Sequence, residues 1–197
     1  MMVAGQSQSL LNREVLPFYA SLLSFVGVAL LLDALLHLAD LVWVGRYLGI
    51  PGVILILASA RYSLRKRKFI TSGKPSKLLR EHEQLAWAGS LLILVHAGIH
   101  FNAWLGWLAV GAMIVNVASG LTGKYLLGRA QKGLAGRRQA LADKGFSADE
   151  IAERTHSDSL TVKTIKQWRV IHVPITLAFA GLALAHMIAI FLFWGWK

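Results

Sequence analysis

The chain has 197 residues, of which 55% are hydrophobic, and it carries 21 Lys and Arg against 10 Asp and Glu. The apolar residues form long runs and the basic residues lie between them, a pattern that argues against a soluble nucleic-acid-binding protein and indicates a membrane protein. The chain has no cysteine, which excludes iron–sulfur clusters, disulfides, Cys-ligated zinc and covalently attached c-type haem. Any metal must be bound by His, Met or carboxylate.

The apolar runs are long enough to span a membrane, because a helix needs about 20 apolar residues to cross the hydrocarbon core. In chain order they predict a single membrane domain, an all-α integral membrane bundle of five helices. The expected spans are about 15–38, 48–62, 84–101, 104–127 and 170–196. We expect the first span to be a retained helix and not a cleaved signal peptide.

Two basic segments set the expected orientation. The segment 61–80 holds eight Lys and Arg and the segment 124–169 holds ten, whereas the other connections are nearly free of positive charge. The positive-inside rule places both segments in the cytoplasm. With five spans the N-terminus is then cytoplasmic and the C-terminus is outside. We expect the plasma (inner) membrane of a prokaryote.

The segment 128–169 is expected to be a cytoplasmic loop with one short helix, because Ser147 and Glu150 form a capping-box pattern. The sequence from Lys144 to Lys163 also resembles the helix-turn-helix of a response-regulator DNA-binding domain. The second helix of that motif would run directly into the fifth span, which leaves no recognition helix free to enter a DNA groove. We therefore expect no nucleic-acid partner.

Histidines are repeated at one spacing on the third and fifth helices. His82 and His96 are 14 residues apart, and so are His172 and His186. Fourteen residues fall about 40° short of whole helical turns and rise about 21 Å, so both members of a pair share one face at different depths. Ionisable groups inside a membrane are costly and indicate function.

The third and fifth helices should run in parallel, because only the fourth helix separates them. Their histidines then lie at matching depths, which predicts two b-type haems with bis-histidine axial ligation of the iron. His82 and His172 would hold the inner haem, and His96 and His186 the outer haem. His100 is an alternative ligand to His96, or it could line an outer quinol site with His37 and Asp33.

Other residues were considered around the two haems. Arg80 and Arg169 lie at the inner end of the bundle and are candidates to pair with haem propionates, although the positive-inside rule also explains them. Gly89 lies midway between His82 and His96, where a small residue would let a flat porphyrin approach the backbone. The same glycine would equally allow two membrane helices to pack closely.

With these residues in place, the chain resembles the two-haem membrane domain of the ferric reductase and NADPH oxidase superfamily. In that family the third and fifth helices each carry two histidines about 14 residues apart. The resemblance covers His82–His186 well and the first two helices only in general plan. It implies electron transfer across the membrane between two b haems. The four histidines on two helices also look like the cytochromes b of quinol-linked respiratory complexes.

The chain departs from that superfamily because no flavin or nicotinamide domain follows His186. We therefore expect electrons to enter through another subunit or from quinol, and we interpret the chain as an electron-transfer subunit of an oxidoreductase complex. Expected partners are a flavoprotein, an iron–sulfur protein or a multihaem cytochrome, together with membrane lipids. The alternative is a haem-free membrane scaffold or transporter subunit with structural histidines. The absence of internal repeats and broken helices argues against transport.

Overall fold

The computed structural model describes residues 16–99 and 103–193, apart from the side chains of Lys124, Trp168 and Arg169. Within these ranges the regular structure is helical and no strand occurs, which confirms the all-α class. Four segments are long and apolar enough to cross a membrane, judged by length and composition. They are Leu16–Leu38, Val42–Lys66, Trp104–Ala142 and His156–Phe193.

The first two spans differ in how closely they follow the sequence pattern. Helix α2 (Leu16–Leu38) has the expected bounds. The second candidate span consists of three consecutive short helices, α3 (Val42–Tyr47), α4 (Gly49–Ser59) and α5 (Arg61–Lys66). Together they cover 25 residues and exceed the expected range 48–62 at both ends, because Arg46 ends the apolar run without ending the helical path.

The third helix, α6 (Pro75–Ile99), begins nine residues before the expected start at 84. Pro75 stands at its first position, where proline is well tolerated because the first backbone N–H of a helix has no intrahelical partner. The added turns are polar, and α6 is not among the four candidate spans. The count of five spans therefore stays a prediction, and residues 100 and 101 lie outside the described residues.

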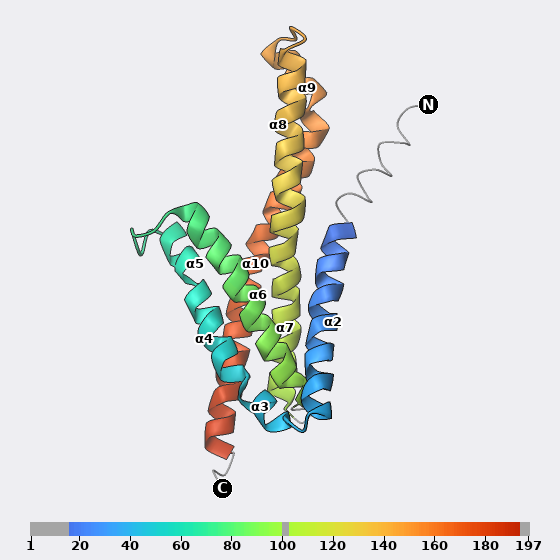
Figure 1. The fold of residues 1–197 in the computed structure, drawn as a ribbon. Helices are drawn as coiled ribbons and strands as arrows, with labels where there is room; N and C mark the ends of the chain where they lie inside the picture. Colours follow the sequence, from blue (N-terminus) through green and yellow to red (C-terminus); the bar gives the residue numbers. More distant parts are fainter. Residues whose placement is uncertain (1–15, 100–102, 194–197) are drawn as a thin grey trace.

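The last two spans continue well beyond the expected membrane boundary. Helix α7 (Trp104–Leu121) passes through a wide π-helical segment, η2 (Thr122–Leu127), directly into α8 (Gly128–Ala142). Helix α10 (His156–Phe193) begins 14 residues before the expected start at 170. Figure 1 shows α8 and the first turns of α10 projecting together beyond the other helices. Hydropathy marks where a chain leaves lipid, and these helices do not end there.

The projecting hairpin is closed at its tip by polar contacts. Arg137 Nη1 lies 2.8 Å from Asp158 Oδ2, and Arg138 Nη2 donates to Ser159 Oγ at 3.0 Å. The short helix expected in this region is α9 (Ala148–Arg154), and its capping box between Ser147 and Glu150 is complete. The segment 128–169 is thus mostly helical and contains more than the one short helix expected.

The bundle is built from two antiparallel helix pairs, α4 with α6 and α7 with α10, and α2 packs on α6. One buried cluster joins α2 and α6 through Phe25 and Val95, both 1% exposed. A second cluster centres on Met113 and Phe179, with Ile93 of α6 packed against it. In Figure 1, α6 and α10 run in the same direction, yet their described parts make no extensive backbone contact with each other.

Candidate functional site

His82 is half-buried on the first half of α6 and is held by the end of α4. Its Nδ1 lies 3.0 Å from the backbone carbonyl oxygen of Ser59. The ring of Tyr62 lies beside it, with ring centroids 5.6 Å apart. A carbonyl oxygen only accepts hydrogen bonds, so Nδ1 carries the proton and Nε2 carries the lone pair.

His96 repeats this arrangement one ligand spacing further along α6. Its Nδ1 lies 3.4 Å from the carbonyl oxygen of Gly45 in α3, which again assigns the lone pair to Nε2. The face of the ring lies against Gly49 of α4. A Cβ atom on Gly49 would stand 2.9 Å from Cδ2 of His96, closer than real Cβ contacts come. The ring can occupy this position because Gly49 has no side chain.

His172 is held by α7, the helix that pairs with α10. Its Nδ1 lies 3.0 Å from the hydroxyl oxygen of Ser119, which is 4% exposed. One turn further along α10, the hydroxyl of Thr176 lies 2.9 Å from Oδ1 of Asn116 on α7 and 2.7 Å from the carbonyl oxygen of His172. These bonds join α7 and α10 on both sides of His172.

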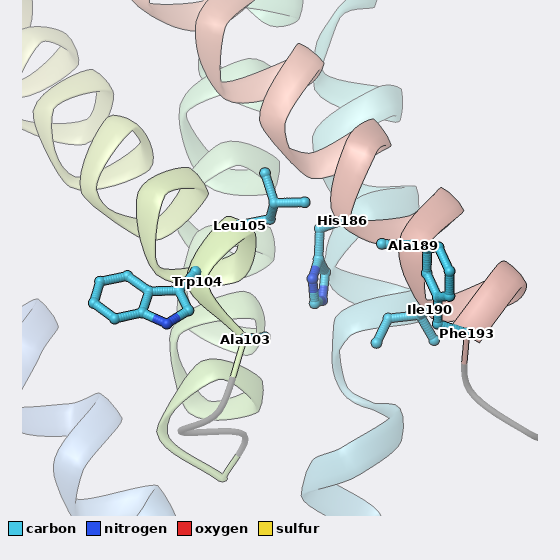
Figure 2. A pocket seen from close by; sticks show the side chains of 7 residues that line it. All are labelled: Ala103, Trp104, Leu105, His186, Ala189, Ile190 and Phe193. Atoms are coloured by element: carbon cyan, nitrogen blue, oxygen red, sulfur yellow. The ribbon is translucent and has the colours of Figure 1, made fainter.

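His186 projects from α10 into a hollow of about 600 Å³ beside the start of α7 (Figure 2). Gly106 of α7 lies against the ring, because a Cβ atom there would stand 3.4 Å from Cε1 of His186. The other residues that line the hollow are apolar: Ala103, Trp104, Leu105, Ala189, Ile190 and Phe193. Its volume is in the range of about 300–1,000 Å³ typical of small-molecule sites.

The four half-buried histidines lie at two levels separated by packed side chains. His96 and His186 are close enough for their charges to interact. Phe179 lies seven residues from both His172 and His186, and it packs with Met113 in the cluster that lies between the two levels. The structure thus brings the expected outer pair together. The pairing of His82 with His172 stays a prediction.

The imidazole geometry bears on what these residues can bind. In His82, His96 and His172, Nδ1 is turned toward the neighbouring helix pair member, so Nε2 on the opposite ring edge is directed away from it. This is how metal-ligating histidines are usually held. No group of three or more His, Cys, Asp or Glu suited to a bare metal ion occurs among the described residues. A bis-histidine haem needs only two.

The remaining candidates are placed as follows. Arg80 lies beside Lys74 and Lys77 at a small hollow on α6, and two residues correspond to about 200° around a helix, so Arg80 points away from the face of His82. The side chain of Arg169 and all of His100 lie outside the described residues. The propionate contacts and the alternative ligand therefore stay predictions.

Two further expectations concern small or acidic residues. Gly89 faces Gly52 of α4 at a close helix crossing, since a Cβ atom on Gly89 would stand 2.8 Å from the carbonyl oxygen of Gly52. It therefore serves helix packing and not the approach of a porphyrin. Asp33 and His37 do lie together, with Asp33 Oδ1 3.7 Å from His37 Nδ1 and buried against Gly98 of α6.

Sequence reasoning missed the residues that hold the histidines. Ser59 and Gly45 act through backbone carbonyls, which carry no sequence signal. Ser119 and Gly49 are ordinary residues in apolar helices until the neighbouring helix is in place. Comparison with family models, with curated proteins and with solved structures gives no match.

Proposed function

We propose that the chain is a di-haem b cytochrome that carries electrons across the membrane as a subunit of a larger redox complex. A bound b haem supplies one-electron transfer at its iron. The residues of this chain would hold two such groups, one near each membrane face. His96 and His186 would ligate the outer haem, and His82 and His172 the inner one.

The observation that carries this proposal is the way the histidines are anchored. Backbone carbonyls accept hydrogen bonds from Nδ1 of His82 and His96 and leave the lone pair on Nε2, the atom that ligates haem iron in most bis-histidine sites. A histidine kept only for packing has no need for the same nitrogen to be anchored on two levels of one helix.

The packing of the helices agrees with a group between α6 and α10. Each of these helices packs along its own partner, and their described parts lack extensive contact with each other. The parallel directions of α6 and α10 keep paired histidines at similar depths (Figure 1). Apolar residues surround the outer pair and would exclude water, which tunes the reduction potential of a bound haem.

The role of the protein would be to hold, orient and bury. Gly49 and Gly106 allow the rings of His96 and His186 to lie close to helix backbones. Arg169 remains a candidate partner for a propionate of the inner haem. Electrons would enter and leave through another subunit, such as a flavoprotein, an iron–sulfur protein or a multihaem cytochrome, or by exchange with quinol.

The experiment that tests this function is a pyridine haemochrome assay on the purified protein. We expect two b haems per chain, extractable into acid acetone because the chain has no cysteine to bond them. His186→Ala should remove the outer haem and His172→Ala the inner one. His156→Ala is the matched control, because His156 is exposed at the tip of the projecting hairpin and should leave both haems bound.

A well-folded protein without haem would refute the proposal and leave the haem-free scaffold or transporter in its place. Retention of both haems in the variants of His172 and His186 would move the ligands elsewhere. Retention in the His186 variant alone would overturn the outer pair, which is the pair that the geometry supports best.

A further inference from the structure

The three anchored histidines differ in the chemistry of their anchors. His82 and His96 bond to backbone carbonyls, which only accept hydrogen bonds and are present whatever side chain stands there. His172 bonds to the hydroxyl of Ser119, which can accept or donate. Among these three ligands, His172 is the one whose anchor depends on the identity of a side chain.

The surroundings of Ser119 fix the direction and strength of that bond. The side chain is almost fully buried, at 4% exposure, and hydrogen bonds are electrostatically stronger where water is excluded. The contacts of Thr176 with Asn116 and with the His172 carbonyl hold α7 and α10 in register one turn away. The ring of His172 therefore meets Ser119 at a set distance and orientation.

We propose that Ser119 is a positioning residue that sets the reduction potential of the inner haem through His172. The inference rests on the proposed function. When the Ser119 oxygen accepts the proton of Nδ1, the imidazole becomes a more basic ligand through Nε2. A more basic ligand favours the oxidised iron, so the bond lowers the potential of the inner haem relative to His172 without its anchor.

The chain offers a matched set of variants. Ser119→Ala removes the hydroxyl with little change in volume, and Ser119→Thr keeps it. Thr176→Val removes the neighbouring contacts between α7 and α10 but leaves the Nδ1 bond of His172 in place. The readouts are haem content, a spectroscopic redox titration of both haems, and thermal unfolding of the protein in detergent.

In Ser119→Ala we expect about a tenfold fall in the preference of the inner site for oxidised over reduced iron, the lower end of the roughly 10–100-fold effects of such anchoring groups. For one electron this raises the potential by about 59 mV. The outer haem should keep its potential, and Ser119→Thr should restore the inner one. Thr176→Val should lower thermal stability and leave both potentials unchanged. Loss of the inner haem alone from Ser119→Ala, with recovery in Ser119→Thr, would also support the inference.

An unchanged inner potential in a Ser119→Ala protein that binds both haems would overturn this inference and leave the proposed function intact. Equal potentials in Ser119→Ala and Ser119→Thr, or the same shift in Thr176→Val, would show that packing and not the hydroxyl is responsible. A wild-type protein without haem would overturn the proposed function itself, and this inference with it.

Discussion

Gly49 provides the most direct test of the outer histidine site. The ideal Cβ of Gly49→Ala would stand 2.9 Å from Cδ2 and 3.1 Å from Nε2 of His96, whereas ordinary contacts begin at 3.4 Å. The ring must therefore move by about 0.5 Å, the difference between 3.4 and 2.9 Å. The bond from its Nδ1 to Gly45 is already 3.4 Å long, beyond the usual range of about 2.7–3.2 Å, and this movement would break it.

The expected magnitude follows from these distances. Overpacking of this kind costs about 1–3 kcal/mol, and replacing Gly by Ala in a helix returns about 1 kcal/mol of helix propensity. The fold should therefore lose no more than about 2 kcal/mol by this difference. Loss of the anchoring bond should weaken haem binding by roughly 10–100-fold. We expect selective depletion of the outer haem from a protein that remains folded.

The assay is haem content and the redox titration of Gly49→Ala, with unfolding followed by tryptophan fluorescence. Gly27→Ala is the control, because a Cβ atom on Gly27 meets nothing within 4 Å. Two haems with unaltered potentials in Gly49→Ala would refute the placement of His96 as an outer ligand. Equal losses in both variants would point to a general effect on helix packing.

Three further predictions concern packing, the hairpin tip and orientation. Gly89→Ala should destabilise the protein by about 1–3 kcal/mol in thermal unfolding, because its Cβ would meet the Gly52 carbonyl oxygen at 2.8 Å; an unchanged midpoint would contradict this crossing. The backbone N–H of Ser147 is the first cause that lowers the pKa of Glu150 below its ordinary value of 4.5. The capping box therefore stabilises α9 above that pH and loses this contribution as the pH falls through the lowered pKa, so amide exchange in α9 should accelerate in acid, and Ser147→Ala should remove the acid effect. Because the chain lacks cysteine, Lys144→Cys should react with an impermeant maleimide in inverted vesicles and not in intact cells; labelling of intact cells would reverse the assigned orientation.

Several features could be predicted from the sequence because they depend on local periodicity. The spacing of 14 between His82 and His96 places both on one face of any α-helix, wherever that helix packs. The long apolar runs predict membrane helices from length alone, and α2 has the expected bounds. The capping box of α9 is contained within four residues and needs no partner helix.

Other features were decided by the packing of helices against each other. The sequence pattern does not reveal that Ser119 meets His172, that Gly49 lies against His96, or that Gly89 faces α4, because each contact joins residues of different helices. The continuation of α7 into α8 was also missed, since hydropathy falls at the edge of the lipid while the backbone bonds of a helix do not depend on that boundary. Periodicity assigns a residue to a face, and only the neighbouring helix determines what that face touches.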